Sequence, residues 1–592
     1  MHPSRTGRLP VEDYLDGVHR RFLGLRDGAV ADYIPPLGTV DPEQFAIAVA
    51  TTDGQVYGVG DVGAAFTIQS ISKPFTYGLA LQDRGLAEVR ARIGVEPSGD
   101  AFNSISLDAT GRPRNPMINA GAIAAAGLVD GDDPFARVLA AYGRWAGRPL
   151  EVDTEVYLAE RDTGHRNRAI GHMLRAVGSL DGDPERALDV YFRQCSVAVT
   201  CNDLAVMAAT LAARGVNPLT VEQALADASV NQVLSVMTTC GMYDAAGEWL
   251  VGVGIPAKSG VSGGVIGVLP GQLGIAVFSP RLDAVGNSTR GVAVFKQLSK
   301  DLRLHFVHTP RTARAAVVGR TLAESPSTRS RPPAARDRLD GATDRCLVLE
   351  TSGDVLFAGA EALSRAALED PHRYVLVDLS RSTTVDPAAA RLLAGLARSL
   401  ARVGDELVLA GANEVTATAV GVRHFASPDA AREWCEDRLL GAAAAPDDAG
   451  LQLAEHPVCA GLGAADLAAL AALARPLDLR PGDVLVEEGA PALQVFLLLG
   501  GDLEVSTATG AGTRRRLATL SPGTTVGEAA LTVGGRHTAR VRATTGVRCV
   551  ALPALALAGA PLTLRLHLTQ AFLVGAHRAL TRATREVATL SR

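Results

Sequence analysis

A serine and a lysine stand three residues apart in the run Ser70-Ile71-Ser72-Lys73, within a chain of 592 residues that contains only four lysines. Arginine cannot release its proton near neutral pH, whereas a lysine removed from water can become a neutral base. A serine hydroxyl that gives its proton to such a lysine can attack a carbonyl carbon. The pair therefore predicts acyl-transfer chemistry, and the alternative is an unrelated serine and lysine on one helix face.

A second lysine opens the run Lys258-Ser259-Gly260-Val261. The apolar runs around it and a Pro-Gly turn predict antiparallel strands, and the glycines would let a substrate approach the backbone. If this strand borders the cleft that holds Ser70, the backbone amides of Ser70 and Val261 can both donate to one developing oxyanion. Taken alone, Lys258-Ser259-Gly260 also suits an ordinary strand edge, so it indicates a catalytic role only together with Ser70.

Local signals predict the elements that position these residues. Residues 45–60 form two apolar runs around an Asp-Gly turn, which predicts two short strands. Residues 66–84 predict a helix that ends at Gly85, with a proline tolerated in its first turn. On such a helix Lys73 lies one turn after Ser70 on the same face, and the helix N-terminus favours a developing alkoxide.

These residues resemble the serine-dependent glutaminases of the β-lactamase-like fold, over about residues 10–308. The resemblance implies a catalytic domain with an antiparallel sheet and a helical subdomain. It rests on seven segments in order, which are Asp32-Tyr33-Ile34-Pro35-Pro36, the Ser70 helix, RNPMINAGAI from Arg114, YLAERDTGHRNRAI from Tyr157, VYFRQCSVAVT from Val190, MTTCGMYDAAGEW from Met237 and KSGVSGG from Lys258.

The resemblance implies the catalytic roles and the reaction. Ser70 is expected to be the nucleophile and Lys73 its base, while Tyr243 relays protons to the leaving ammonia and to the hydrolytic water. Val261 is expected to complete the oxyanion hole, and Lys258 belongs to the same catalytic group. The expected reaction is hydrolysis of the side-chain amide of L-glutamine to L-glutamate and ammonia through an acyl-enzyme.

The resemblance also implies how the ends of glutamine are bound. A carboxylate can neutralise an ammonium, and amides and phenols can hydrogen-bond a carboxylate without acting as competing nucleophiles. Taken singly, each of these residue types also suits a turn, a cap, an aromatic core or a solvated surface. The implied ligands of the α-amino and α-carboxylate groups are Tyr33, Asn119, Glu160, Asn167 and Tyr191, and Ser70, Tyr243 and Val261 contact the same substrate.

Two positions in the strand after Lys258 distinguish this chain from its relatives. The family usually has glycine where this chain has Ser262, and we expect the extra hydroxymethyl group to change the rate without abolishing activity. Ser259 stands where β-lactam-binding relatives commonly have threonine, which is typical of glutaminases. The sequence thus favours glutaminase over a β-lactam-binding enzyme.

The sequence predicts no cofactor and no metal site. The expected acyl transfer needs only protein groups and water. The twelve histidines show no spacing typical of metal ligands, as the seven-residue separation of His165 and His172 illustrates.

Composition limits the other function classes. The net charge of -5 gives no electrostatic argument for a nucleic-acid partner. No export signal and no long apolar run are present, so we expect a cytoplasmic protein and not a penicillin-interactive hydrolase or the tail of a transporter. Seven cysteines without a CxxC pair predict reduced, mostly buried thiols. The resemblance further implies a homo-oligomer, either a dimer or a tetramer.

We assign residues 1–308 to the catalytic domain, and two more domains are predicted after it. Residues 309–342 are rich in Pro, Ser, Thr and Arg, which predicts a linker. Residues 343–440 alternate strands and helices and resemble a STAS domain of the anti-sigma-factor antagonist type. Where regulatory members carry Asp-Ser-Ser-Gly, this chain has Asp386-Pro387-Ala388-Ala389, so we expect a scaffold or protein-contact role rather than a phosphorylation switch.

Residues 452–592 resemble a cyclic-nucleotide-binding β-roll. Its phosphate cassette matches Gly527-Glu528-Ala529-Ala530-Leu531, with the glutamate expected at the ribose hydroxyl. His537 takes the place of the family's phosphate-binding arginine, with Arg536 and Arg540 nearby. Because imidazole cannot form the bidentate contact of a guanidinium, the sequence favours a β-roll that has lost its ligand over one that binds a cyclic nucleotide.

Overall fold

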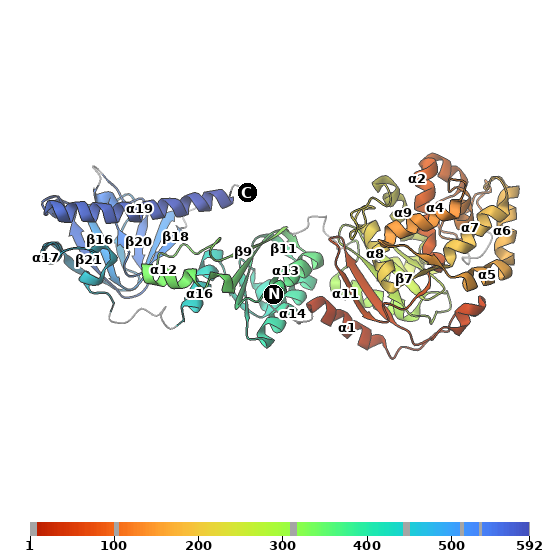
Figure 1. Cartoon of the computed structure of the whole chain (residues 1–592), viewed down its shortest axis with the longest axis horizontal. Coiled ribbons are helices and arrows are strands. Elements are labelled where there is room, and N and C mark those ends of the chain that lie inside the picture. Colours follow the sequence, from red (N-terminus) through yellow and green to blue (C-terminus); the bar gives the residue numbers. More distant parts are fainter. Residues whose placement is uncertain are drawn as a thin grey trace. The chain divides into compact units, whose positions relative to one another are not determined.

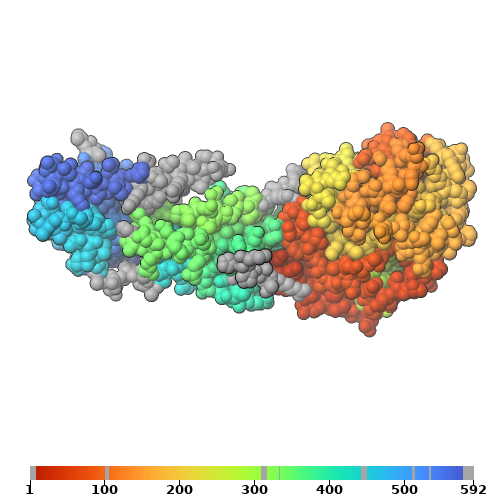
Figure 2. All heavy atoms as spheres, viewed as in Figure 1, coloured from red at the N-terminus to blue at the C-terminus, as the bar shows by residue number. Residues whose placement is uncertain are grey.

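The computed structural model describes residues 9–99, 106–307, 316–441, 450–509, 514–531 and 535–590, with the backbone alone at residues 333 and 578–590. The chain divides into two compact units. In Figure 2 the red N-terminal residues and the orange and yellow residues that follow them form one continuous body. The first unit comprises Met1–Ala316, Ser352–Leu368 and Ser382–Ser399, and the second comprises Val317–Thr351, Glu369–Arg381 and Leu400–Arg592.

The first unit contains the predicted antiparallel sheet (Figure 1), in the order β2-β1-β8-β7-β6. Its central strands are buried along their whole length, as expected for a sheet covered on both faces. The strands are β1 (Ala46–Thr51), β2 (Val56–Gly60), β6 (Ala257–Ser259), β7 (Gly264–Leu269) and β8 (Leu273–Phe278). The two strands predicted within residues 45–60 are confirmed by β1 and β2.

Helices cover both faces of this sheet. Gly264 of β7 approaches Leu204 of α8 (Cys201–Ala212), whereas Gly267, three residues later, approaches Phe295 of α11 (Thr289–Leu302). Because side chains on a strand alternate between faces, α8 and α11 lie on opposite sides of β7. Helix α1 (Pro10–Phe22) packs beside α11 and the edge strand β2.

A helical subdomain completes the predicted architecture. Several of its helices begin at an aspartate whose side chain accepts a hydrogen bond from the first turn, as at Asp133, Asp153 and Asp183. A small sheet in the order β3-β5-β4 joins Phe66–Thr67, Val197–Val199 and Glu151–Val152. The helices are α2 (Ser72–Arg92), α3 (Asn119–Gly127), α4 (Pro134–Ala146), α5 (Thr154–Thr163), α6 (His165–Ala176), α7 (Pro184–Cys195), α9 (Asp227–Cys240) and α10 (Ala246–Gly252).

The helix predicted over residues 66–84 is wrong at its start and incomplete at its end. Phe66 and Thr67 form strand β3, because they pair with β5. Ser70 lies in a 3-10 turn, Gln69–Ile71, and α2 begins only at Ser72. Gly85 leaves the helical conformation with φ 79°, as a helix end requires, but the chain bends there and continues as a helix to Arg92.

The STAS-like segment has a five-stranded sheet in the order β13-β12-β11-β10-β9. Strand β12 pairs in parallel with β11 and with β13, and the first six residues of β11 are buried. The elements are β9 (Ala316–Thr321), α12 (Pro333–Asp340), β10 (Cys346–Val355), α13 (Phe357–Glu369), β11 (Tyr374–Val385), α14 (Pro387–Arg402), β12 (Glu406–Ala410), α15 (Glu414–Val420), β13 (Arg423–Phe425) and α16 (Pro428–Leu440).

Two regular elements lie in the segment whose composition predicts a linker. Strand β9 occupies an edge of the STAS-like sheet and is mostly exposed, so its sequence carries no apolar alternation that would indicate a strand. Helix α12 begins at Pro333 and is preceded by Pro332, and prolines mark a helix start as well as a linker. Residues 309–315 of the predicted linker lie outside the described residues.

The C-terminal segment forms two four-stranded sheets, in the orders β14-β21-β16-β19 and β15-β20-β17-β18, as a β-roll requires. Its strands are β14 (Arg475–Leu479), β15 (Val484–Val486), β16 (Gln494–Gly500), β17 (Leu503–Ala508), β18 (Arg514–Leu520), β19 (Thr525–Val526), β20 (Arg540–Ala543) and β21 (Val547–Pro553). Its helices are α17 (Ala464–Leu473), α18 (Ala554–Ala558) and α19 (Leu562–Leu590).

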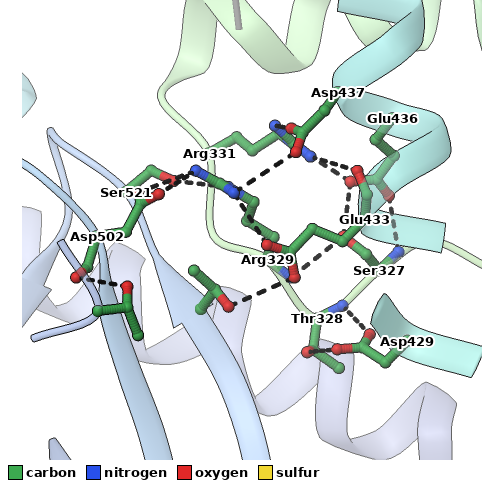
Figure 3. Close-up of polar contacts among 12 residues, drawn as sticks. Ser327, Thr328, Arg329, Arg331, Asp429, Glu433, Glu436, Asp437, Asp502 and Ser521 are labelled. Carbon is green, nitrogen blue, oxygen red and sulfur yellow. Dashed lines mark hydrogen bonds and ion pairs between the residues drawn. The ribbon is translucent and has the colours of Figure 1, made fainter. Parts of the chain in front are cut away.

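Within the second unit, the side chain of Arg329 contacts both α16 and the β-roll (Figure 3). Arg329 Nη1 contacts Glu433 Oε1 of α16 at 2.9 Å, and Nη2 contacts the two oxygens of Asp502 at 2.9 and 2.8 Å. Its Nε donates to the Ser521 hydroxyl at 2.9 Å. All three nitrogens of this guanidinium therefore have an acceptor, although the side chain is only 12% exposed.

The residues around Arg329 fasten the same segment to α16. Arg331 pairs with Glu436 at 3.0 Å and with Asp437 at 2.7 Å. Ser327 donates through its backbone and its hydroxyl to Glu436, at 2.7 and 2.6 Å. On the other side, the Ser330 amide donates to the Thr519 carbonyl at the end of β18. We call Ser327–Arg331 the arginine junction, because its arginines contact both neighbouring elements.

Candidate active site

Ser70 lies in a tight turn directly before α2. The preceding residue, Gln69, has φ 49°, a left-handed conformation that side-chain-bearing residues adopt only where the surroundings impose it. The amide of Ile68 donates to the Val197 carbonyl, which holds the chain immediately before the turn. Ser70 is largely buried, so little of it is open to solvent.

Lys73 is fully buried one turn further along. Its Nζ donates to Asn119 Oδ1 at 2.7 Å, so the hydrogen-bond partner at this distance is a neutral amide. Burial lowers the pKa of Lys73 to about 8, and nearby acidic groups including Glu160 oppose this shift. Near neutral pH a substantial fraction of this amine can therefore be unprotonated, as a general base requires.

Tyr243 lies between the two buried lysines. Lys258 Nζ lies 3.9 Å from the centre of the Tyr243 ring, and Lys73 Nζ lies 5.8 Å from it. The Tyr243 hydroxyl donates to the Ser259 carbonyl at 3.4 Å. Burial raises its pKa, while hydrogen bonds with Ser70 and Ser259 oppose the rise. A protonated phenol is thus placed beside the serine hydroxyl.

Lys258 is also fully buried, and its Nζ donates to the Ser259 carbonyl at 2.7 Å. Burial holds its pKa well below the ordinary value, and the charge of Lys73 lowers that pKa further. Two amines that disfavour each other's protonation share one site, so the site favours a low total positive charge.

The strand that carries Lys258 ends against the Ser70 turn. A Cβ on Gly260 would lie 3.1 Å from the Ile68 carbonyl, which shows how closely the two segments approach. Gly263 has φ 101°, and a Cβ there would lie 2.3 Å from the Ser279 carbonyl. These glycines permit the turn that contains the buried Val261. Ser262 is buried in the same turn, and its hydroxyl has no hydrogen-bond partner.

Two asparagines continue the polar chain from Lys73. Asn119 begins α3 and is largely buried, with its amide nitrogen donating to Asn167 Oδ1 at 2.9 Å. Asn167 belongs to α6 and is half-buried. The lysine, Asn119 and Asn167 are therefore connected by two consecutive hydrogen bonds, which orient both amides.

Glu160 supplies a carboxylate on the last turns of α5 and is largely buried. Burial raises its pKa to about 7, while a hydrogen bond from Gln69 and the charge of Lys73 oppose the rise. Tyr191 is buried beside it, and burial together with nearby acidic groups raises its pKa. Tyr33 is half-exposed, and burial of its hydroxyl and the nearby Glu160 raise its pKa.

The structure thus gathers the residues that the sequence singles out around Ser70, from both the sheet and the helical subdomain. Sequence reasoning missed Gln69, whose left-handed backbone shapes the turn and whose side chain hydrogen-bonds Glu160. It also missed Cys195, a buried thiol that forms hydrogen bonds with Tyr191 and Ser72. Their residue types carry no signal, and only their positions beside Ser70 and Tyr191 indicate a role.

Other predicted features concern groups away from Ser70. All seven cysteines are free and buried, which confirms that part of the prediction. Across the described ranges, no three His, Cys, Asp or Glu residues are grouped so that they could hold a metal ion. In the same part of the chain no helix is long and apolar enough to cross a membrane.

The cassette of the β-roll lies beside His537. Gly527 has φ 86°, and a Cβ there would lie 3.3 Å from the His537 ring. Partial burial lowers the pKa of His537, so the imidazole carries little charge at neutral pH. Arg536 donates to the Gly489 carbonyl at 2.7 Å, and Arg540 pairs with Glu487 at 3.4 Å. Both nearby guanidinium groups are therefore held by other acceptors.

Three family models of known proteins match separate parts of the chain. The glutaminase family model matches residues 28–306, the Mlab STAS domain model matches residues 339–425, and the cyclic nucleotide-binding domain model matches residues 476–560. Glutaminase 1 of Bradyrhizobium diazoefficiens is 43% identical over 539 residues, which cover 88% of this chain and 87% of the relative. The chain belongs to the glutaminase family. The glutaminase of Trichormus variabilis is 55% identical over 300 residues, which cover 50% of this chain and 90% of the relative.

Solved glutaminase structures share the fold. The crystal structure of Mglu in its glutamate form is 40% identical, with a TM-score of 0.51, and the match covers 68% of this chain and 98% of that one. The structure of the probable glutaminase ybaS is also 40% identical, with a TM-score of 0.50, and covers 51% of this chain and 99% of that one. The predicted β-lactamase-like fold of the catalytic domain is thereby confirmed, as are the STAS-like and cyclic-nucleotide-binding-like domains.

Proposed function

We propose that this chain hydrolyses the side-chain amide of L-glutamine to L-glutamate and ammonia through an acyl-enzyme on Ser70. The observation that carries the proposal is Lys73, a fully buried amine whose pKa falls to about 8 and which lies one turn from the serine. Family membership supports glutamine as the substrate, since the relatives bear the name glutaminase.

In the first half-reaction, neutral Lys73 accepts the Ser70 proton and the serine oxygen attacks the amide carbon. The backbone amides of Ser70 and Val261 donate to the tetrahedral oxyanion. Tyr243 passes a proton to the leaving nitrogen, which departs as ammonia when the carbon–nitrogen bond breaks. Tyr243 is then reprotonated by the lysine ammonium. Burial favours this transfer, because it disfavours a lasting positive charge on Lys73.

In the second half-reaction, water attacks the γ-glutamyl ester and its proton reaches neutral Lys73, either directly or through Tyr243, which takes the proton from water as it gives its own to the lysine. The oxyanion again receives hydrogen bonds from the two backbone amides, and collapse of the intermediate releases glutamate with the proton returned to Ser70. Lys258 contributes by position, since its Nζ holds the Ser259 carbonyl and lies against the Tyr243 ring.

The ends of glutamine are assigned to the residues around Glu160. An ionised Glu160 neutralises the α-ammonium, and its raised pKa falls again when that positive charge arrives. Asn119, Asn167, Tyr33 and Tyr191 are assigned to the α-carboxylate and to the orientation of the substrate. The hydrogen bond from Asn119 to Asn167 is present before binding and orients the two amides.

The remaining parts of the proposal concern the whole chain. We assign residues 1–308 to the catalytic domain, 309–342 to the connection, 343–440 to the STAS-like domain and 452–592 to the β-roll, with a scaffolding or regulatory role for the last two. The protein acts in the cytoplasm as a homo-oligomer, without a nucleic-acid partner and without a cyclic nucleotide.

One assay separates this activity from β-lactam hydrolysis and from a non-catalytic role. Purified protein is given glutamine, asparagine and a chromogenic β-lactam, and release of ammonia or chromophore is followed. We expect rapid ammonia release from glutamine, much slower release from asparagine and no β-lactam turnover. Absence of ammonia release from glutamine, in protein with an intact fold, would contradict the proposal.

A further inference from the structure

The last helix exposes a stripe of leucines. Leu562, Leu566 and Leu573 of α19 are 66%, 62% and 68% exposed. Side chains of this size are usually removed from water in a helix that packs on a sheet, because burial of apolar surface is favourable. Figure 1 shows α19 as one long helix that continues past the strands of the β-roll.

The opposite face of α19 is the one that packs on its own domain. Leu564, Leu568 and Phe572 are buried in the core of the β-roll together with side chains of β16 and β21. Successive residues of a helix are rotated by about 100°, so Leu566 and Leu573 point roughly opposite to Leu568. Helix α19 therefore has two apolar faces, and its own domain uses only one of them.

The sequence of α19 has a seven-residue repeat. In the sequence, Leu566, Leu573, Leu580 and Val587 follow one another at intervals of seven residues. The residues three positions after each of them are Thr569, Ala576, Ala583 and Leu590. Helices that carry apolar or small residues at this 3,4 spacing pair with each other in coiled coils. The 29 residues of α19 provide about four such repeats over a length of about 44 Å.

The charges of this helix avoid the stripe. Its arginines and its single glutamate, Arg565, Arg578, Arg582, Arg585 and Glu586, all stand at other positions of the repeat. A seam without charges fits an identical helix, because an acidic or basic partner would need complementary charges within the seam. The observed pattern is thus self-complementary, as an interface on a two-fold axis must be.

We propose that α19 is an interface between two copies of this chain, in which the seam formed by Leu562, Leu566, Thr569, Leu573 and Ala576 packs against the same seam of the second copy, and the sequence spacing continues it to Leu590. The pairing joins two chains through their C-terminal helices and is independent of the proposed glutaminase activity. Its chemical requirement is burial of leucine side chains that the β-roll leaves in water.

Sedimentation equilibrium of the full chain tests this interface. Leu566→Glu combined with Leu573→Glu places a charge at two seam positions and should halve the mass of the assembly. The matched control combines Val415→Glu with Val574→Glu, which are exposed apolar residues outside the seam, 80% and 47% exposed. This control should keep the wild-type mass. An equal mass for wild type and the seam variant would overturn the proposal.

A cross-linking measurement covers the case in which the seam variant folds poorly. Ala576 stands at the middle of Leu562–Leu590, so it meets its counterpart whether the two helices run parallel or antiparallel. All seven natural cysteines are buried, which makes Ala576→Cys the accessible thiol. A short bismaleimide should join two full chains through this residue but not through Val415→Cys. Failure of Ala576→Cys to cross-link above the level of that control would contradict the proposed pairing.

Discussion

The catalytic site and the arginine junction both bury cations, but they surround them with different partners. At the catalytic site, Lys73 and Lys258 donate at 2.7 Å to a side-chain amide and a backbone carbonyl. At the junction, Arg329 and Arg331 donate to carboxylates of α16 and, for Arg329, to Asp502 of the β-roll (Figure 3). The buried arginines thus donate hydrogen bonds directly to charged carboxylates, whereas the buried lysines donate theirs to neutral oxygens.

The difference separates two uses of positive charge. A carboxylate partner would hold a lysine protonated, whereas neutral partners leave desolvation to lower its pKa, as it does for Lys73 to about 8. Arginine keeps its proton under either condition and suits a permanent ion pair. The composition of the chain reflects this division, because two of its four lysines lie in the site that we propose to exchange protons.

The largest expected effect comes from removing the proton-exchanging groups. Ser70→Ala removes the nucleophile, and Lys73→Arg keeps the charge but removes the base, so each should lower kcat for glutamine by at least about 100-fold. Lys296→Arg, the same substitution at an exposed lysine of α11, is the control and should leave kcat unchanged. The measurement is steady-state ammonia release. Near-normal turnover by Lys73→Arg would show that the site does not need a cation that can lose its proton, and the proposed difference between the two regions would be wrong.

The comparison of the two regions also shows which features could be predicted from the sequence. The serine, both lysines and the substrate-binding segments could be named, because their residue types and order carry the resemblance. The Gln69 conformation could not, because a left-handed φ at a residue other than glycine has no sequence signal and is imposed by the neighbouring segments. It is also the reason why the predicted helix start at residue 66 failed.

The contacts of the arginine junction could not be predicted from the sequence for a related reason. Its segment is rich in Pro, Ser and Arg, which predicts a linker, and nothing local indicates that Arg329 meets Asp502, 173 residues later. Such pairs are long-range tertiary contacts, which composition does not encode. Strand β9 was not predicted, because an exposed edge strand lacks the alternation of apolar and polar residues that marks a half-buried strand.

The second prediction sharpens the structural role of the junction arginines. Arg329→Ala leaves Glu433 and Asp502 without their shared cation and should destabilise the second unit by about 3 kcal/mol, with glutamine turnover unchanged. Hydrogen exchange of α16 and β17 amides should then accelerate by up to about 100-fold. Arg20→Ala, which breaks an exposed pair with Asp16, is the control. Unchanged hydrogen-exchange rates in Arg329→Ala would show that the junction does not stabilise the second unit.

The third prediction tests the carboxylate of the catalytic region. Glu160→Gln removes the proposed partner of the α-ammonium and should raise KM for glutamine by about 10- to 100-fold, as expected for a charge-assisted contact of about 1.5 to 3 kcal/mol. Glu155→Gln, at an exposed position of the same helix, provides the control. If KM is the same in Glu160→Gln and wild type, another residue binds the amine.

The smallest expected effect is in the β-roll, where a neutral imidazole stands near the cassette. Thermal unfolding of the full chain with millimolar cyclic AMP or cyclic GMP should show no stabilisation, because the phosphate lacks a guanidinium partner. His537→Arg is the informative comparison and should gain a shift. Stabilisation of the wild-type β-roll by about 2.7 kcal/mol, as expected at a hundred times the dissociation constant, would mean that Arg536 or Arg540 changes its partner.

The pH dependence of kcat/KM for glutamine tests the central claim most directly, since it reports the ionisation of groups in the free enzyme. Lys73 must be neutral to accept the serine proton, so kcat/KM should rise with pH through about 8, its lowered pKa. Ionisation of Glu160 near pH 7 should add a lower step that disappears in Glu160→Gln. A rise through pH 8 that persists in Glu160→Gln is the predicted result. A kcat/KM that stays constant or falls between pH 7 and 9 would contradict a neutral Lys73 as the base.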